Sequence, residues 1–331
     1  KYWKYFIKET YQGRANIETI KKMKKILAIQ SNTLKEINIK TDTTLLLALE
    51  GQRKGYQIIW YETKDLTLIG SKVFIRGKKV KFFDKSKNFY KIEKTIKFDL
   101  SKAKIILIRQ NPPFNMDYIN STHFLDHIKT KNIINNPSSV RNVSEKFYST
   151  NFLRYMPDTI FTKNIKEINS FLKKKKKIVI KPIHGYAGKN ILFIKKKLNE
   201  KSIKNYIKNF GHVMVQKYLH KVKEGDKRVF IINGKVKGAI RRLPKKGSIL
   251  SNISQGGVAI ETKLNPRELK ISKIVARSLK KSGIFFAGID LVGGYLIGDI
   301  NVTSPTGLPQ FKNLTGKNLA IDFWNELEKL K

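Results

Sequence analysis

The most apolar stretch of the chain, residues 283–300, also carries two aspartates, Asp290 and Asp299, and several glycines. A membrane-spanning helix does not tolerate acids and glycines in this number near its centre. The pattern instead predicts two paired strands, residues 284–291 and 295–302, joined by a tight turn at Gly293-Gly294. The stretch is therefore expected to be a β-hairpin inside a globular fold.

The two aspartates are predicted to share one face of this hairpin. With a two-residue turn, residue 290 lies opposite residue 297, and side chains alternate along each strand, so Asp290, Ile297, Asp299 and Asn301 point the same way. Asp290 and Asp299 are then diagonal neighbours, roughly 7–8 Å apart at the backbone. Two acids on a solvated edge strand are the simpler alternative. Because Mg²⁺ prefers carboxylate and amide oxygens, we favour a metal site formed by Asp290, Asp299 and Asn301.

The charge of the chain has two interpretations. Lys and Arg number 68 and Asp and Glu 25 among 331 residues, a net charge of +43. Such a charge suits a nucleic-acid-binding protein, but it also suits a lysine-rich composition. The lysines are spread along the chain, and no helix-turn-helix, RNP-type strand or KH-type loop accompanies them. We therefore expect no nucleic-acid partner. The absence of cysteine excludes thiolate zinc sites and cysteine nucleophiles.

The first half of the chain alternates short apolar strands with helices. Strands are predicted at residues 26–30, 56–61, 105–109 and 133–135, with helices at 43–54 and 123–129. This order predicts a small parallel α/β domain ending near Val143. Residues 1–22 are treated as an extension of unknown role. They lack the apolar core of a signal peptide, so a cytoplasmic protein is expected.

The second half mixes helices and strands in an α+β arrangement. Strands are predicted at residues 178–181, 191–194, 212–218, 228–233 and 235–242, the last two joined by an Asn-Gly turn. Helices are predicted at 202–209, 266–282 and 319–330.

Two further segments have the chemistry of a phosphate site. A strand ends at Lys181 and enters a loop with Gly185 and Gly188, which could offer an ammonium and backbone N–H groups to phosphates. The segment 225–228 and the pair Arg241-Arg242 place arginines at strand ends, where they could contact a phosphoryl group. Glycine loops also occur in ordinary hairpins, and charged strand ends are usually solvated.

Together these motifs resemble, in order, those of the bacterial glutathione synthetase family of the ATP-grasp superfamily. The resemblance covers about residues 23–330. Its motifs are Asn38-Ile39-Lys40-Thr41-Asp42-Thr43, residues 50–56, Arg109-Gln110-Asn111-Pro112-Pro113-Phe114, Asn142-Val143-Ser144-Glu145-Lys146, Ile180-Lys181-Pro182, Gln216-Lys217-Tyr218-Leu219, residues 225–229, Gly288-Ile289-Asp290-Leu291 and residues 299–307.

The resemblance implies a fold and a set of roles. It implies a Rossmann-like parallel α/β domain over 23–143, an ATP-grasp small subdomain over 144–215 and a C-terminal subdomain with the metal site over 216–331. The two ATP-grasp subdomains would grip ATP. The implied phosphate contacts are Lys146 and Lys181, and the implied adenine hinge is Gln216, Lys217, Tyr218 and Leu219. Gly185, Gly188 and Asp226 are further expected nucleotide-binding residues. Asp290, Asp299 and Asn301 would hold Mg²⁺, or Mn²⁺, and the implied catalytic residues are Arg228 and Arg242.

The implied reaction joins γ-glutamylcysteine and glycine, with ATP as co-substrate, to give glutathione, ADP and phosphate in a homo-oligomeric enzyme. Several positions depart from the family pattern. Asp299 replaces a usual Glu, Ala187 a glycine, and His184 an often acidic residue, while Leu250 and Val258 stand where relatives have arginines. These departures leave open a ligase for another carboxylate–amine pair, or an inactive homologue that binds anions or nucleic acid.

Overall fold

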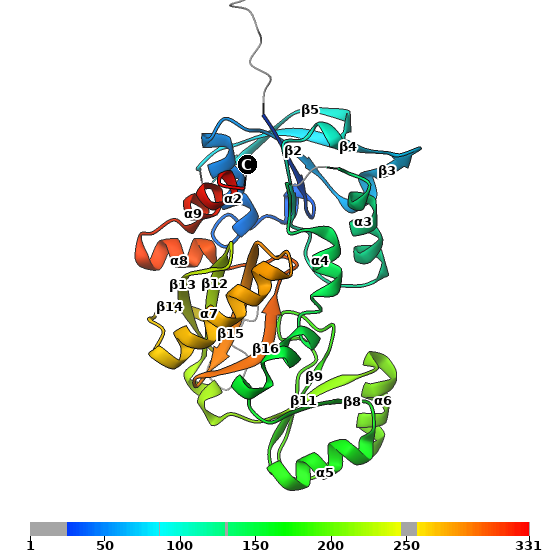
Figure 1. Ribbon diagram of the computed structural model, residues 1–331, viewed down its shortest axis with the longest axis vertical. Coiled ribbons are helices and arrows are strands. Elements are labelled where there is room, and N and C mark those ends of the chain that lie inside the picture. The colour runs from blue at the N-terminus through cyan, green and yellow to red at the C-terminus, as the bar shows by residue number, and fades with distance from the viewer. Residues whose placement is uncertain (1–24, 86, 130–131, 246–256, 331) are drawn as a thin grey trace, which may run out of the picture.

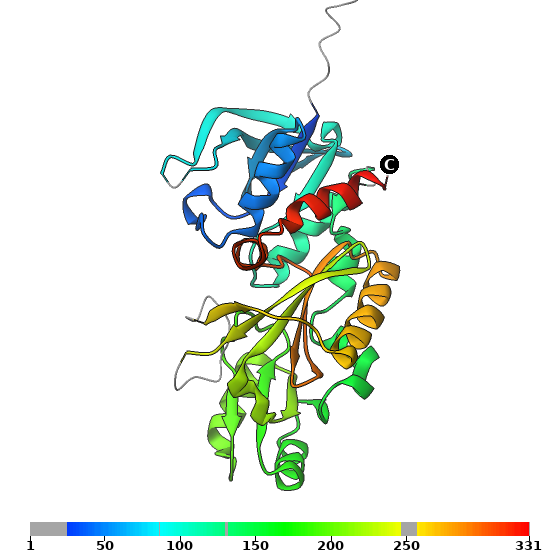
Figure 2. The same ribbon diagram turned by 90° about the vertical axis from the view of Figure 1, so that its left-hand side faces the viewer.

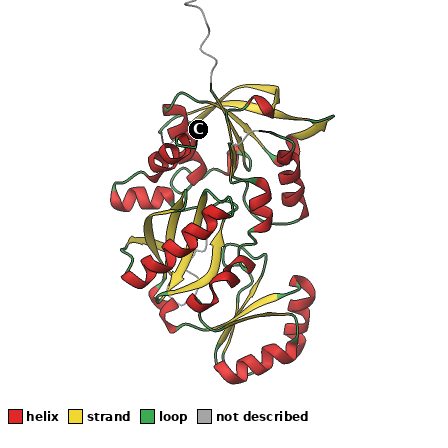
Figure 3. Ribbon diagram, in the orientation of Figure 1, coloured by secondary structure: helices red, strands yellow, loops and turns green. Residues whose placement is uncertain are grey.

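Three β-sheets follow one another along the long axis of the molecule (Figures 1 and 3). The computed structural model describes residues 25–85, 87–129, 132–245 and 257–330. Within these residues no helix is both long enough and apolar enough to span a bilayer. The expected extension at residues 1–22 and Leu250 lie outside the described residues.

The first sheet belongs to the N-terminal part of the chain and has strand order β3-β4-β2-β1-β6-β7, with β5 paired to β4. Four strands run parallel as predicted, in the order β2-β1-β6-β7. The strands are β1 (Ile26–Gln30), β2 (Gln57–Tyr61), β3 (Leu66–Ile69), β4 (Lys72–Phe82), β5 (Tyr90–Asp99), β6 (Ile105–Ile108) and β7 (Ile133–Ile134). Strands β3, β4 and β5 were not predicted from the sequence; they extend the sheet with antiparallel pairs.

Helices α2 (Thr43–Arg53), α3 (Met116–Asp126) and α4 (Pro137–Asn142) accompany this sheet. Helix α2 begins as predicted, because the side chain of Asp42 caps the backbone N–H of Leu45. The predicted helix 123–129 is wrong in its bounds. Asn115 caps the N–H of Tyr118 and starts α3 seven residues earlier, before the stretch that looked apolar.

The second sheet is antiparallel, with strand order β10-β9-β11-β8. Its strands are β8 (Thr159–Thr162), β9 (Ile178–Pro182), β10 (Leu192–Ile194) and β11 (Val213–Lys217). Helices α5 (Ile165–Lys175) and α6 (Glu200–Phe210) pack on it through a small separate core that includes Ile168, Ile180 and Val213. This module forms one end of the molecule (Figure 1).

The third sheet has strand order β14-β13-β12-β15-β16 and is also antiparallel. Its strands are β12 (Asp226–Ile232), β13 (Lys235–Leu243), β14 (Val258–Glu261), β15 (Phe286–Val292) and β16 (Tyr295–Asn301). The helices that follow or interrupt it are α7 (Pro266–Lys281), α8 (Leu308–Thr315) and α9 (Leu319–Glu328). Short 3₁₀ helices complete the chain at Leu34–Glu36, Thr63–Asp65, Leu100–Lys102, Phe147–Tyr155 and His220–Glu224.

The predicted hairpin is present as β15 and β16, but its register is not the regular one expected. Leu291 pairs with Leu296, and Ile289 pairs with Ile300, so residues 297–299 together lie opposite Asp290. Gly298 allows this bulge with a φ of +84°, and a Cβ there would come within 2.5 Å of the Met214 methyl group. The expectation that residue 290 directly faces residue 297 is therefore wrong.

The last helix returns to the first sheet (Figures 1 and 2). Helix α9 packs on α2, and the indole N–H of Trp324 donates to the carbonyl of Leu47 over 2.9 Å. Gly51 on α2 makes room for this ring, since a Cβ there would lie 2.5 Å from it. The N-terminal sheet and the end of the chain thus share one hydrophobic core.

Asn135, directly after β7, joins the first sheet to the third. Its Nδ2 donates to the carbonyls of Phe286 and Val302, both over 2.8 Å. Its Oδ1 accepts from the N–H groups of Phe285 and Phe286, at 2.9 and 2.8 Å. The side chain is buried, so its four hydrogen bonds leave no capacity unused and hold β15 and the end of β16 against the N-terminal domain.

Replacing Asn135 with Ala should lower the free energy of unfolding by about 3 kcal/mol, because several buried backbone groups lose their partners. Chemical denaturation followed by circular dichroism measures this loss. Asn205→Ala, on the exposed face of α6, serves as the matched control and should change stability by less than about 0.5 kcal/mol. An Asn135→Ala variant as stable as the control would contradict the role of Asn135 as a link between the sheets.

Candidate active site

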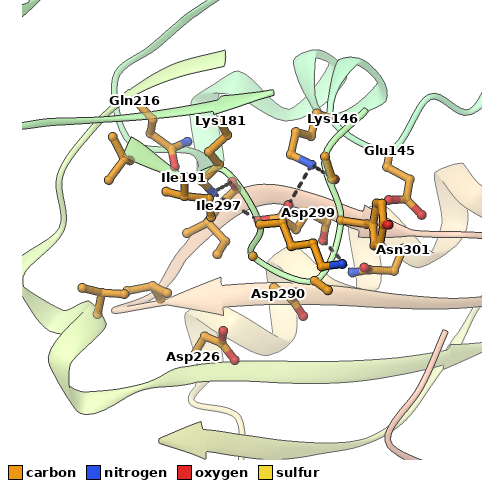
Figure 4. A pocket seen from close by; sticks show the side chains of 18 of the residues that line it. Glu145, Lys146, Lys181, Ile191, Gln216, Asp226, Asp290, Ile297, Asp299 and Asn301 are labelled. Carbon is orange, nitrogen blue, oxygen red and sulfur yellow. Dashed lines mark hydrogen bonds and ion pairs between the residues drawn. The ribbon is translucent and has the colours of Figure 1, made fainter. Parts of the chain in front are cut away.

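A deep cleft lies between the second and third sheets (Figure 4). Its volume is about 980 Å³, its open side included. Residues from both sheets and from the loop after β9 line it. Among them are all fourteen residues predicted from the sequence as nucleotide contacts, metal ligands or catalytic groups: Lys146, Lys181, Gly185, Gly188, Gln216, Lys217, Tyr218, Leu219, Asp226, Arg228, Arg242, Asp290, Asp299 and Asn301.

One end of the cleft is largely apolar. Segment 216–219 comprises the last two residues of β11 and the two that follow it. The apolar side chains Val179, Ile191, Leu219, Val222 and Val292 also line the cleft. The amide of Gln216 is buried and donates to the Thr159 hydroxyl over 2.9 Å, which fixes the end of the strand. An apolar lining of this kind is suited to a heterocyclic base.

Two lysines meet one carboxylate in the middle of the cleft. Lys181 Nζ lies 3.1 Å from Asp299 Oδ2, and Lys146 Nζ lies 3.4 Å from Asp299 Oδ1 (Figure 4). Lys146 also donates to the carbonyl of Gly185 over 2.7 Å and so attaches the glycine loop. Burial acts to raise the pKa of Asp299, but the two ammonium groups outweigh it and hold this pKa below its usual range.

The glycine loop departs from the family at Ala187 and His184, and both departures have structural consequences. Ala187 takes a φ of +53°, a conformation that costs a residue with a Cβ more than it costs glycine. His184 stacks on Phe114 with ring centroids 6.1 Å apart, which joins the loop to the N-terminal domain. Burial lowers the pKa of His184, and Lys146 lowers it further, so the ring favours its neutral form.

Beneath the lysines, four charged side chains form a buried chain across β12, β13 and β15. Arg228 binds both oxygens of Asp290, Nε to Oδ1 at 2.5 Å and Nη2 to Oδ2 at 2.9 Å. Arg242 bridges Asp290 Oδ2 at 2.9 Å and Asp226 Oδ1 at 2.6 Å. Burial opposes ionisation of Asp290, but the two guanidinium groups hold its pKa well below the usual range, whereas burial raises the pKa of Asp226.

The expected metal ligands lie together, although not as the regular hairpin predicted. No group of three His, Cys, Asp or Glu side chains suited to a metal occurs in the described part of the chain. The set here is two carboxylates and an amide, Asp290, Asp299 and Asn301. The Asn301 amide nitrogen donates to the Gly288 carbonyl over 3.1 Å, which leaves its Oδ1 as a possible ligand. Hard oxygen donors of this kind fit Mg²⁺ bound together with phosphate oxygens. Both oxygens of Asp290 already accept from guanidinium groups, so Asp290 would share them between the arginines and the metal.

A second cavity, of about 1210 Å³, adjoins the cleft. It reaches the N-terminal domain at Asn32 and Asn111 and the loop after β16 at Thr303, Ser304 and Thr306. Six residues line both cavities: Glu145, Tyr186, Ala187, Arg228, Arg242 and Asn301. The cleft and the second cavity thus meet where the two arginines lie. Val258 is 62% exposed and lines neither cavity.

Glu145 lies in the motif 142–146, but the sequence predicts no role for it. Its Oε1 accepts hydrogen bonds from the N–H of Val302 over 3.2 Å and from the Thr303 hydroxyl over 3.1 Å. Burial raises the pKa of this carboxyl. The only sequence signal that could have singled it out is its position next to Lys146.

The fold is an ATP-grasp fold, and comparisons with solved structures agree. D-cycloserine synthetase DcsG superposes with a TM-score of 0.65 at 17% identity, covering 92% of this chain and all of that one. D-alanyl-alanine synthetase A from Vibrio cholerae superposes with a TM-score of 0.60 at 13% identity, covering 93% of this chain and 98% of that one. The ATP-grasp ligase PsnB, solved with a minimal precursor, Mg and ADP, superposes at 0.58, with 13% identity over 92% of this chain and 98% of its own.

Sequence comparisons identify the family. The family models for the prokaryotic glutathione synthetase N-terminal domain and ATP-grasp domain match residues 25–141 and 145–316. Glutathione synthetase of Mesorhizobium japonicum is 36% identical over 312 residues, covering 92% of this chain and 99% of that protein. Glutathione synthetase of Buchnera aphidicola subsp. Baizongia pistaciae is 36% identical over 310 residues, covering 92% and 95%. The chain belongs to the prokaryotic glutathione synthetase family.

The buried charge chain makes a prediction about stability. Asp290→Asn should lower the free energy of unfolding at neutral pH by about 3 kcal/mol, because two buried guanidinium groups lose their counter-charge. Urea denaturation measures the change. Asp322→Asn, which breaks a more exposed contact with Lys237, is the control and should cost less than about 1 kcal/mol.

The stability difference between the wild type and Asp290→Asn should depend on pH. Because the folded-state pKa of Asp290 is lowered, its stabilisation is complete above the unfolded-state pKa of about 3.9 and is lost as the pH falls further. The stability difference between wild type and Asp290→Asn should therefore shrink below pH about 4. A difference that grew on acidification would show that Asp290 is not held as a carboxylate.

Proposed function

We propose that this protein is an ATP-dependent ligase that joins γ-glutamylcysteine to glycine, giving glutathione, ADP and phosphate through an acyl-phosphate intermediate. One observation carries the proposal beyond family membership. The cleft with the lysines and carboxylates opens into a second cavity at Arg228 and Arg242, so a nucleotide and a carboxylate substrate can meet between two guanidinium groups.

The cleft supplies the groups that ATP requires. Segment 216–219 would hold the adenine, as the apolar lining of the cleft suggests. Lys146 and Lys181 would bind the phosphates together with the glycine loop at Gly185 and Gly188, where the Gly185 N–H itself donates to the Pro182 carbonyl over 3.2 Å. Asp226 would hold Arg242 at the phosphate end. Both ammonium groups already converge on the site through Asp299, so their side chains are placed before the nucleotide binds.

The arginines would stabilise the reacting groups. In the first step a carboxylate oxygen attacks the terminal phosphorus of ATP, and ADP leaves with the electrons of the broken P–O bond. In the second step the amine nitrogen forms a bond to the acyl carbon, and phosphate leaves with the electrons of the C–O bond. The nitrogen sheds two protons overall, one retained by phosphate and one released to solvent. Fixed guanidinium groups stabilise the charge that develops in both steps.

Asp290, Asp299 and Asn301 would hold Mg²⁺, with Mn²⁺ as a substitute. A divalent cation at this position neutralises phosphate charge and orients the transferred phosphoryl group. The shorter Asp299 in place of the family's Glu remains within reach of both lysines, which supports its place at the phosphates.

The domain division, oligomeric state, location and partners of the protein are also proposed. We propose the division 23–143, 144–215 and 216–331, a homo-oligomeric state and a cytoplasmic location, with small-molecule substrates and without a nucleic-acid or membrane partner. Leu250 and Val258 motivate a second candidate, an ATP-grasp ligase for another carboxylate–amine pair. The exposed side chain of Val258, away from both cavities, weighs against that candidate.

Release of phosphate from Mg-ATP tests the function. Turnover that requires γ-glutamylcysteine and glycine together supports it, and turnover only with another pair favours the second candidate. No turnover with any pair, combined with tight DNA binding at physiological salt, would instead support an inactive anion-binding homologue.

Asp299→Ala should abolish turnover at ordinary magnesium concentrations, by at least about 100-fold, because the site loses a metal ligand and the counter-charge of two lysines. The measurement is ATP-dependent glutathione formation. Asp84→Ala removes the same charge from an exposed site near Arg53 and should retain full activity. Unchanged turnover in Asp299→Ala would exclude this residue from the metal site.

A further inference from the structure

The boundary between the cleft and the second cavity has an uneven distribution of charge. Of the six residues that line both spaces, two are arginines and only Glu145 is acidic. Asp226, Asp290 and Asp299 line the cleft but not the second cavity. Among the described residues, Glu145 is therefore the one carboxylate that the second cavity presents to a substrate.

Glu145 forms no direct ion pair in the described structure, although the ammonium of Lys146 acts on it from beyond contact distance. The other three cleft carboxylates form ion pairs, Asp226 with Arg242, Asp290 with both arginines and Asp299 with two lysines. No such contact is made by Glu145, whose two hydrogen bonds both involve Oε1. Burial disfavours the charged form of Glu145, and the neighbouring Lys146 offsets this only in part, so a bound cation would stabilise the carboxylate further.

The position of this carboxylate matches the demands of the second reaction step. The acceptor amino acid arrives as an ammonium, and its nitrogen must lie next to the acyl carbon that the two arginines flank. Glu145 lies at this boundary, on the same side of the pocket as Asn301 (Figure 4). The arginines repel an ammonium, so the acceptor nitrogen needs one anionic contact near them.

We propose that Glu145 binds the ammonium group of the acceptor amino acid and holds its nitrogen beside the acyl phosphate. This proposal rests on the proposed ligase function and adds the subsite for the acceptor amine. Lys146, the next residue, contacts the glycine loop and Asp299, so the two adjacent side chains would align the amine with the phosphates.

The test compares two nucleophiles in Glu145→Gln, which keeps the size of the side chain and an oxygen for Val302 and Thr303 but removes the charge. With γ-glutamylcysteine and Mg-ATP, glycine requires the ammonium contact, whereas hydroxylamine is uncharged at neutral pH and traps the acyl phosphate as a hydroxamate. The variant should lose at least about 30-fold in kcat/KM for glycine and keep hydroxamate formation near the wild-type rate. Equal losses with both nucleophiles, or no loss with glycine, would overturn the proposal.

Two controls separate this role from others. Thr303→Val keeps the carboxylate but removes one of its hydrogen bonds, and it should preserve the preference for glycine. If Thr303→Val reproduces the selective loss, Glu145 acts only by fixing the loop. A raised magnesium requirement of Glu145→Gln with both nucleophiles would make Glu145 a metal ligand. Wild-type protein that releases no ADP with either nucleophile would refute the ligase function itself.

Discussion

The buried chain Asp226–Arg242–Asp290–Arg228 is the interaction on which the site depends. Each guanidinium group is held by carboxylates on neighbouring strands, so strand pairing fixes its position before any substrate binds. Burying these charges costs free energy, which only mutual pairing and hydrogen bonding offset. The buried chain therefore fixes two positive charges at the junction of the two cavities, at a cost in stability that an apolar core would avoid.

The net charge of +43 is not distributed evenly, because several of the few acids lie at the cleft. Acidic residues are more frequent in the lining of the cleft than in the whole chain, since Asp226, Asp290, Asp299 and Glu145 all lie there. The three aspartates hold the lysines and arginines that we propose face the phosphates, whereas Glu145 pairs with none of them. In a chain with so many cations, the position of the few acids decides which cations can take part in a defined site.

Much of the architecture follows from the sequence, and the exceptions have physical causes. The parallel strands of the first domain and helix α2 with its Asp42 cap were predictable from apolar runs and capping chemistry. Strand β5 shows no alternation because most of its side chains are exposed or half-buried on both faces, and the alternation of β4 is interrupted by a register shift at Lys79 and Val80. The bulge at residues 297–299 could not be predicted, since it depends on Gly298 fitting against Met214 of another sheet. Glu145 was likewise invisible as a site residue, because its importance lies in the meeting of two cavities.

The packing of α9 on α2 also bears on how the protein is made. The core that contains Leu27, Ile58 and Trp60 is completed by Phe323, Trp324 and Leu327 from the last helix. During synthesis the N-terminal strands leave the ribosome first, yet they lack this apolar cover until almost three hundred further residues have been added. The first domain must therefore remain incompletely packed throughout most of translation, which makes it the part of the nascent chain most in need of protection from aggregation.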